Sequence, residues 1–524
     1  MTLSAVLSPI DQASALLFEG ADWDYDKLRK VYDAIEEIAF KELGLDIYPN
    51  QIEVITAEQM LDAYASIGMP LMYKHWSFGK HFARDEGLYR RGMRGLAYEI
   101  VINSSPCISY VMEENTMTMQ ALVIAHAAFG HNHFFKNNHL FKQWTDARSI
   151  LDYLEFAKNY IAECEERHGA TAVEHVLDAA HALMSHSVHR YPRRRSFDLR
   201  QELERERERK EYQQRMFNDL WRTVPRGPGA PPAAKALSER RKLLDLPEEN
   251  LLYFLEKKAP RLKLWQRELL RIVRQISQYF YPQKQTKMIN EGCATFVHYY
   301  IMNRLYQNRQ ITEGSMLEFL HSHSSVIFQP DFDDPRYSGI NPYALGFAMM
   351  QDIKRICESP TDEDRLWFPD FAGNHDPFKT LREAWANYRD ESFILQFLSP
   401  QLIRKLKLFL VKDDSEEDHI GVEKIHNERG YREVRRSLAC QYDIARQEPE
   451  IQIVDVDLAG DRKLILNHRV RNGVLLELGD AQAVLCHIAR LWGYDVVLRE
   501  VSPVDEQNVL REISAQAQAG PIDE

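Results

Sequence analysis

Apolar and polar positions repeat with a helical period over most of the chain. Residues 22–45 place apolar side chains at helical spacing behind an aspartate-rich start, which predicts an amphipathic helix with an acidic first turn. The same period returns between residues 116 and 187, in segments of which one ends at a glycine. Beyond residue 246, two strongly helical stretches are predicted to end at Pro260 and Pro282, because proline has no backbone N–H with which to continue a helix.

Two regions depart from this helical pattern. Residues 96–115 are rich in β-branched and aromatic residues around a Ser-Ser-Pro break, which predicts a short hairpin. From about residue 450 the period falls to two, with a turn-like tetrad at 459–462 and a further predicted strand at 473–480. A helix and another strand follow within 481–501. The predicted fold class is α+β, predominantly α-helical, with a large helical main domain and a small C-terminal α+β module.

The length of 524 residues exceeds the size at which one hydrophobic core normally stops growing, so more than one domain is expected. Residues 188–245 hold a basic knot, a mixed-charge run with little to bury, and then a segment with four prolines and two glycines. We interpret them as a solvated charged helix followed by a flexible linker, with an arginine phosphate site as the alternative. The predicted division is a first helical half at 1–187, this linker, a second helical half at 246–400 and the α+β module at 401–524.

Composition narrows the class of protein further. The chain is 44% hydrophobic and 27% charged, as in ordinary globular proteins, and its formal charge of −12 disfavours nucleic acid as a partner. It contains no apolar run of the roughly 18 residues that suggest a membrane span, and its N-terminus lacks the features of a signal peptide. Six scattered cysteines without a CxxC pair argue against a disulfide framework and for the reducing cytoplasm.

Four of the 19 histidines fall within fourteen residues: His126, His131, His133 and His139. Imidazole is the commonest metal ligand, and nitrogen donors carried into a buried segment need a metal, a proton partner or a hydrogen-bonded neighbour. On an ideal α-helix, however, His126 and His131 would point about 140° apart. They would share a site if Gly130 and Asn132 ended the helix at His131 and turned its ring back.

A second candidate segment is NEGCATFVHY. Its Glu291 and His298 are seven residues apart and therefore on one helix face, although roughly 10.5 Å apart along the axis. The segment resembles the second helix of gluzincin peptidases, in which an Asn-Glu-Gly-x-Ala helix supplies a glutamate to zinc already held by two histidines. That resemblance implies Glu291 as a ligand beside His126 and His131, with His298 as a fourth ligand or as a group behind the ligands. Such a set suits zinc, iron or manganese; the alternatives are a hydrogen-bonded polar seam between two buried helices and acid–base use without metal.

Weaker candidates lie elsewhere. Carboxylates and histidines between residues 163 and 181 align on helix faces, but a di-metal bundle needs Glu-x-x-His on two helices, so exposed salt-bridge faces are favoured. Glu163 is retained as a candidate base or extra ligand. His321 and His323 suit a helix cap or a loop ligand, and the turn-rich residues 337–346 suit a cleft lining or a packing surface. The sequence has no phosphate-binding glycine loop, nucleophile elbow or dinucleotide fingerprint.

Long stretches at 116–138, 279–303 and 337–356, with the words WSFGK (76–80) and GYREVRR (430–436), resemble the SpoVR (stage V sporulation protein R) family, called YcgB-like in bacteria that do not sporulate. The resemblance runs from about residue 15 to about residue 500. It implies a link to spore cortex formation or to stress and starvation responses, alongside a PrkA-type serine kinase and a von Willebrand-like partner protein. It implies no particular reaction. Cys293 stands where relatives often carry tryptophan, which weakens this thiol as a required nucleophile.

Two functional hypotheses follow. In the first, a divalent transition metal held between the 120s and 290s helices polarises a carbonyl or activates water for hydrolysis, while Glu163 or another nearby carboxylate moves the proton. The substrate class to test first is a cell-wall precursor or peptide, as the cortex link implies. In the second, the protein is a non-catalytic adaptor or regulator of the kinase system, with residues 188–245 and the C-terminal module as docking surfaces.

Overall fold

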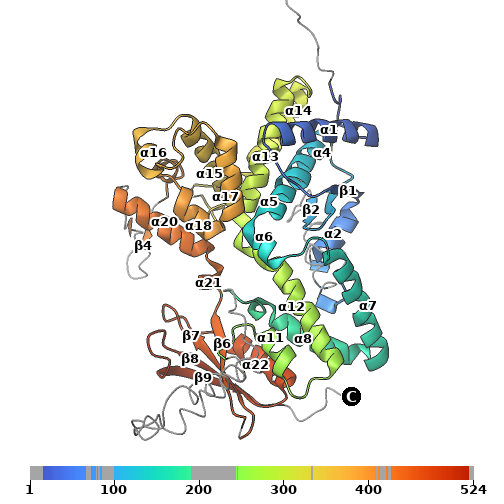
Figure 1. The fold of residues 1–524 in the computed structure, drawn as a ribbon, viewed down its shortest axis with the longest axis vertical. Helices are drawn as coiled ribbons and strands as arrows, with labels where there is room; N and C mark the ends of the chain where they lie inside the picture. Colours follow the sequence, from blue (N-terminus) through green and yellow to red (C-terminus); the bar gives the residue numbers. More distant parts are fainter. Residues whose placement is uncertain are drawn as a thin grey trace, which may run out of the picture. The chain divides into compact units, whose positions relative to one another are not determined.

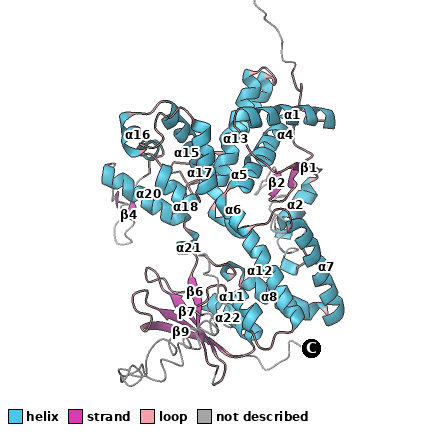
Figure 2. Ribbon diagram, viewed as in Figure 1, coloured by secondary structure: helices cyan, strands magenta, loops and turns pink. Residues whose placement is uncertain are grey.

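The computed structural model describes most of the chain and divides it into two compact units. The described residues are 16–65, 72–77, 80, 83–84, 99–190, 244, 246–331, 334–408, 411–412, 421–422, 427–458 and 460–517. The first unit comprises Met1–Tyr160 with Tyr279–Arg446, and the second comprises Ile161–Gln278 with Gln447–Glu524. Figures 1 and 2 show a mainly helical first unit and a four-stranded sheet in the second. The predicted linker at 188–245 lies almost wholly outside the described residues.

A small three-stranded sheet in the first unit positions one edge of the site. Its strands β1 (Asn50–Ile55), β2 (Glu99–Ile102) and β3 (Cys107–Met112) are ordered β1-β3-β2. Strands β2 and β3 pair antiparallel, which confirms the predicted hairpin, and β1 joins β3 in parallel, which the sequence did not predict. Both β2 and β3 pack against the histidine-rich helical segment.

That segment forms one continuous helical rod. It runs from α4 (Met117–Val123) through the π-helix η1 (Ile124–His131) into α5 (Asn132–Asn137). The Thr116 side chain caps its start by accepting a hydrogen bond from the backbone N–H of Met119. The expectation that the helix ends at His131 is wrong, because the backbone stays helical there and beyond. The Asn132 N–H instead reaches back five residues to the Ala127 carbonyl, as a π turn requires.

Helix α13 (Lys287–Gln307) packs against this rod, and α15 (Pro342–Glu358) packs against α13, in both cases almost backbone to backbone. Figure 1 shows α13 between the rod and α15. A methyl group built on Gly130 would lie 2.6 Å from Cα of Ala294 in α13, and one built on Gly292 would lie 2.7 Å from Cα of Gly346 in α15. These glycines therefore set how closely the three helices approach.

The remaining helices of the first unit enclose an aromatic and aliphatic core that includes Phe129, Phe296 and Trp385. The predicted amphipathic helix is α1 (Tyr25–Lys41). The side chain of its N-cap residue, Asp24, accepts a hydrogen bond from the Lys27 N–H. The other elements are α2 (Ala57–Ala65), α6 (His139–Trp144), α14 (Glu313–Val326), α16 (Asp362–Trp367), α17 (Pro377–Asn387), α18 (Asp390–Phe397), α19 (Pro400–Lys405), β4 (Val411–Lys412), β5 (Gly421–Val422), α20 (Glu428–Tyr442) and α21 (Ile444–Gln447), with α1 at Tyr25–Lys41.

Three of the described helices contribute residues to both units: α7 (Ile150–His168), α12 (Leu264–Gln285) and the short α21. The prediction that the helix ends at Pro282 is wrong, because α12 continues through this proline to Gln285. A proline near the last turn leaves only a short stretch of helix beyond it, where Thr286 Oγ1 donates to the Pro282 carbonyl at 2.7 Å. The predicted end before Pro260 is confirmed by α11 (Leu251–Lys258).

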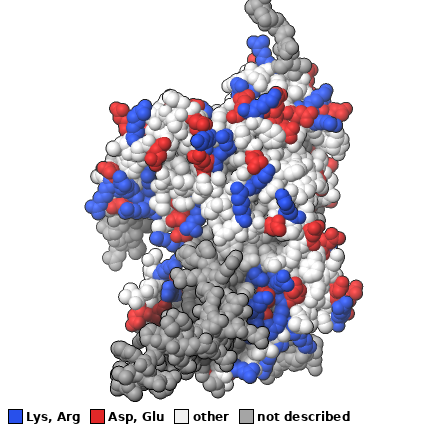
Figure 3. Space-filling view, viewed as in Figure 1, with Lys and Arg blue, Asp and Glu red and all other residues white. Residues whose placement is uncertain are grey.

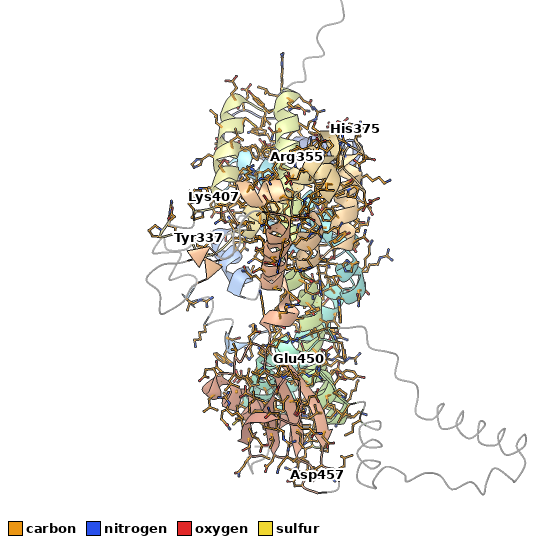
Figure 4. The ribbon with its side chains drawn as sticks, turned by 90° about the vertical axis from the view of Figure 1, so that its left-hand side faces the viewer. Tyr337, Arg355, His375, Lys407, Glu450 and Asp457 are labelled. Atoms are coloured by element: carbon orange, nitrogen blue, oxygen red, sulfur yellow. The ribbon has the colours of Figure 1, made fainter. Side chains whose placement is uncertain are left out.

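The second unit contains the sheet and helix of the predicted α+β module, whereas residues 401–446 of its predicted range belong to the first unit. Strands β6 (Glu450–Val456), β7 (Leu464–Arg469), β8 (Val496–Val501) and β9 (Val509–Ala515) are ordered as in the sequence, with α22 (Leu478–Trp492) between the parallel pair β7 and β8. The helices α8 (Ala170–Ala182), η2 (Met184–His186) and α11 belong to the same unit. The β6–β7 hairpin is confirmed, and Figure 4 labels Glu450 at the start of β6 and Asp457 just after its last residue.

The strand predicted at 473–480 is wrong. The Leu476 N–H donates to the buried Glu500 carboxylate at 2.9 Å, and Glu477 caps α22 by accepting from the Asp480 N–H at 2.6 Å. Both interactions commit the backbone of this segment to a connection and a helix start, so it is not available to pair in a ladder.

Charged side chains of both signs are interleaved over the face shown in Figure 3. Basic side chains gather at its left edge over α20, where Arg429 pairs with Glu433 at 3.0 Å and Arg432 with Glu428 at 2.9 Å. These pairs lie one helical turn apart and neutralise part of the local charge. Within the described residues, no helix combines the length and the apolar character needed to cross a membrane.

Candidate metal centre

The two helical segments singled out by the sequence meet in the first unit. His126 and His131 extend from η1, with their rings edge to face and their centroids 4.6 Å apart. Glu291 extends from α13, and its Oε2 lies 3.7 Å from Nε2 of His126 and 3.5 Å from Nε2 of His131. Three side chains separated by up to 165 positions in the chain therefore point into one place.

The π-helix is the reason that both imidazoles share a face. In an α-helix, residues five apart diverge, because four residues already complete more than one turn. The wider π turn closes its hydrogen bond at the fifth residue, so His131 returns to the side of the rod that carries His126. Single π turns of this kind are frequent at functional sites.

A second carboxylate, from Glu99 at the start of β2, completes the group. Its Oε1 lies 3.6 Å from Nε2 of His126, and ligand atoms of Glu99, His126 and His131 all lie within 4.8 Å of one another. The sequence analysis missed this residue. The signal that could have identified it is a single acidic side chain inside the otherwise apolar strand segment at 96–102, since a charge there needs a partner.

The electrostatics of the site separate the two carboxylates. Burial raises the pKa of Glu99, an effect that the charge of His126 opposes and that of Glu291 reinforces. Burial acts on Glu291 in the same sense, but His131 and His126 outweigh it and hold the pKa of Glu291 below its usual value. Glu291 is thus the anionic member of the pair, and Glu99 is the one that more readily carries a proton.

The two imidazoles also differ. Burial lowers the pKa of His131 to about 4, which keeps this ring neutral and its lone pair available. Burial also opposes the charge on His126, but the neighbouring carboxylates of Glu291 and Glu99 raise its pKa overall. Deprotonation of His126 is therefore the step that would have to accompany binding of a cation.

The spacing of these atoms is close to the spacing of ligands around one ion. Ligand atoms held roughly 2.1 Å from one tetrahedral ion lie roughly 3.4 Å from each other. The separations of 3.5, 3.6 and 3.7 Å match that value and lie at or beyond the limit of a hydrogen bond. Both carboxylates remain accessible, with 20% of the Glu99 side chain and 17% of the Glu291 side chain exposed. The donor set fits one divalent ion with two imidazole and up to two carboxylate ligands.

A shell of hydrogen bonds lies behind the imidazoles. Nδ1 of His131 is 3.0 Å from Oδ1 of Asn290, and Nδ1 of His126 is 2.9 Å from Nδ1 of His298. The other ring nitrogen of His298 is 3.0 Å from Nδ1 of His323. Both nitrogens of His298 are thus engaged, which places it behind the ligands, one of the two roles that the sequence allowed. His323 belongs to the same buried group and is neither a helix cap nor a loop ligand.

The other sequence candidates have partners outside this cluster. Glu163 sits on α7 in the second unit, with 57% of its side chain exposed, and pairs with Arg167 at 3.2 Å. Nδ1 of His133 accepts a hydrogen bond from the Asp46 N–H, and His139 is exposed. Two of the four clustered histidines therefore reach the centre.

The turn-rich residues 337–346 contribute in two ways. Tyr343 hydrogen-bonds to Glu291 and helps to keep it ionised. Other members of the segment, Tyr337 among them, line a separate cavity of about 470 Å³ in the first unit, to which Lys407 also contributes. Figure 4 labels both of these residues on the same side of that unit.

Comparisons with known proteins place the chain in a family. The model described as "SpoVR like protein" matches residues 22–447, and that described as "SpoVR-like C-terminal domain" matches residues 449–503. The chain is 55% identical over 496 residues to the "Uncharacterized protein YcgB" of Escherichia coli (strain K12), which covers 95% of this chain and 96% of that protein. No solved structure matches the chain. On the strength of matches that span nearly its whole length, this chain belongs to the SpoVR family.

Proposed function

We propose that the protein is a metal-dependent hydrolase whose centre is formed by His126, His131 and Glu291, with Glu99 beside them. The observation that carries this proposal is the set of donor separations, 3.5 to 3.7 Å, which suits ligands of one ion better than hydrogen-bonded partners. The two neutral or deprotonable imidazoles and the anionic Glu291 favour zinc, iron or manganese.

The residues divide the chemical work between them. A divalent cation at this centre would supply Lewis acidity towards a carbonyl oxygen and lower the pKa of water. Glu99, whose pKa burial raises, is suited to accept and return the proton, the role that the sequence analysis assigned to Glu163. Glu291 is kept ionised by both histidines and by Tyr343, as a metal ligand requires.

The proposed setting comes from the family. The link of SpoVR proteins to spore cortex formation or to stress and starvation responses suggests a cell-wall precursor or peptide as the substrate class. A cytoplasmic location is supported by the six cysteines, all of which carry free thiols. The cytoplasm is also where a PrkA-type serine kinase would meet this protein.

Elemental analysis of the purified full chain tests the centre. Wild-type protein should contain about one equivalent of transition metal, and His126→Ala and Glu291→Ala should lose it while remaining folded by circular dichroism. Glu163→Gln is the matched control, since its side chain is exposed and paired with Arg167. Metal-free wild-type protein after growth and purification with added zinc, iron and manganese, or metal content unaffected by both alanine variants, would overturn the proposal.

An adaptor function is the second candidate, and one feature of the second unit favours it. An apolar groove of about 260 Å³ is lined by Leu251, Leu466 and Leu476, among others. Near it, Val474 and Leu478 expose 69% and 54% of their surface. Exposed apolar side chains beside a groove are typical of protein-binding surfaces.

Direct binding to a purified PrkA-type kinase or to the von Willebrand-like protein tests this role. Replacing Val474 and Leu478 with aspartate should abolish the complex in analytical ultracentrifugation and leave the metal content unchanged. Deleting residues 188–245 tests the other predicted docking segment. Absence of any complex with wild-type protein would contradict the adaptor function.

A further inference from the structure

Three buried imidazoles form a continuous hydrogen-bonded row that begins at the metal centre. His126 on η1 contacts His298 on α13, and His298 contacts His323 on α14, through nitrogen–nitrogen distances of 2.9 and 3.0 Å. All three side chains are at least nine-tenths buried. We call these residues the histidine row.

The proposed metal centre, and not the row alone, assigns the proton on each ring, because these nitrogen–nitrogen contacts can run in either direction. Nε2 of His126 faces both carboxylates and must keep its lone pair to act as a ligand, so with an ion bound the proton lies on Nδ1. That N–H donates to Nδ1 of His298, which places the His298 proton on Nε2. The Nε2–H of His298 then donates to Nδ1 of His323. With His126 fixed as a ligand in this way, each further ring has one tautomer that satisfies its neighbours.

The far end of the row shows that it is not explained by stability. The remaining proton lies on Nε2 of His323, which is buried and has no hydrogen-bond partner among the described residues. Its ring lies among Tyr299, Phe319 and Phe347, with centroid distances of 4.9, 5.6 and 4.9 Å. A buried N–H without a partner is unfavourable, and an apolar ring would suit this pocket better.

We infer that His298 and His323 are positioning residues, which hold His126 in the tautomer and orientation that direct its Nε2 towards the ion. This inference rests on the proposed metal centre and deepens it. Metal-ligating histidines usually donate their second N–H to such an acceptor, and loss of the acceptor weakens metal binding. Asn290 accepts a hydrogen bond from His131 in the same way. A single amide therefore stands behind His131, whereas two further imidazole rings stand behind His126.

Binding of Co²⁺ to the metal-free full chain tests the inference, with affinity from calorimetry and ligand geometry from the visible absorption of the ion. His298→Leu should weaken Co²⁺ binding by roughly ten- to a hundredfold and change the absorption bands. His298→Asn, whose Oδ1 can accept from Nδ1–H of His126, should restore most of the affinity. His323→Phe should weaken binding by less than roughly tenfold, while the metal-free protein unfolds at an unchanged or higher temperature. His133→Asn, in the same segment but outside the row, is the control and should bind as wild type does.

The outcomes separate this inference from the proposed function. Wild-type protein that binds no Co²⁺ or other divalent transition metal would overturn both. Tight wild-type binding that His298→Leu and His323→Phe leave unchanged would overturn the positioning role alone. Equal losses for His298→Asn and His298→Leu, with metal-free stability falling in parallel, would show that the row is only structural and would also overturn it.

Discussion

The close approach of η1 and α13 can be tested by adding one methyl group, in Gly130→Ala. The new Cβ would lie 2.6 Å from Cα and 2.9 Å from Cβ of Ala294. Ordinary carbon contacts are about 3.5–4.0 Å, so the two backbones would have to separate by about 1 Å. Overpacking of this kind costs about 1–3 kcal/mol, and the better helix propensity of alanine offsets about 1 kcal/mol of it. The free energy of unfolding should therefore fall by only about 0–2 kcal/mol.

The effect on the metal centre should be larger than the effect on stability. Gly130 precedes the proposed ligand His131, and Glu291 is on the opposing helix, so separation of the backbones lengthens the distance between their side chains. Binding sites need their groups held within about 0.5 Å of the productive geometry, and a shift of about 1 Å exceeds that tolerance. We expect Gly130→Ala to weaken zinc binding at least tenfold.

Urea unfolding followed by circular dichroism, with and without chelator, and zinc calorimetry measure the two effects. Gly314→Ala is the matched control, because the nearest atom to its new Cβ, Oγ1 of Thr312, would be 3.8 Å away. That variant should keep its zinc affinity and gain up to about 1 kcal/mol of stability. If Gly130→Ala stabilises the protein as the control does and binds zinc as wild type does, the reasoning from helix approach is refuted.

Three further predictions concern stability. Burial lowers the pKa of His133 to about 4, so between pH 6.5 and about 4 the unfolded chain binds a proton there and the folded chain does not. The contribution of His133 to stability is complete above pH 6.5 and is lost as the pH falls, by about 1.4 kcal/mol per pH unit. The free energy of unfolding, measured across this range, should therefore fall less steeply with pH in His133→Asn than in wild type. An unchanged slope would contradict this prediction. Asp390 accepts from the backbone N–H groups of Met288 and Ile289 at the start of α13, so Asp390→Asn should lower the free energy of unfolding by about 1 kcal/mol in urea titrations, and a neutral effect would show that the cap is dispensable. Glu500 is fully buried between His468 and Arg511. Glu500→Gln should leave the charge of Arg511 uncompensated and lower the free energy of unfolding by about 3–5 kcal/mol. Thermal unfolding of the second unit at the wild-type temperature would rule this out.

Local sequence patterns predicted much of the fold because their causes are local. The hairpin of β2 and β3 follows from a β-branched run around a turn, and the amphipathic helix α1 follows from apolar spacing behind a capping aspartate. The failures have tertiary causes. Residues 473–480 alternate like a strand, but the buried Glu500 carboxylate binds their backbone and Glu477 caps a helix. Helix α12 passes through Pro282, although proline usually ends a helix.

The amino-acid sequence alone singled out His126, His131 and Glu291 as candidate ligands, because they stand in recognisable sequence motifs of a few residues each. Only the tertiary structure decided how they meet. The choice of a π turn over an α turn in η1 cannot be read from apolar spacing, since it depends on how the rod packs against α13 at Gly130. Glu99 comes from a strand and His323 from a helix. Each lies nearly 200 residues or more along the chain from at least one of its neighbours in the centre. Periodicity reports on residues within one or two turns, whereas convergence of distant side chains depends on the packing of whole elements.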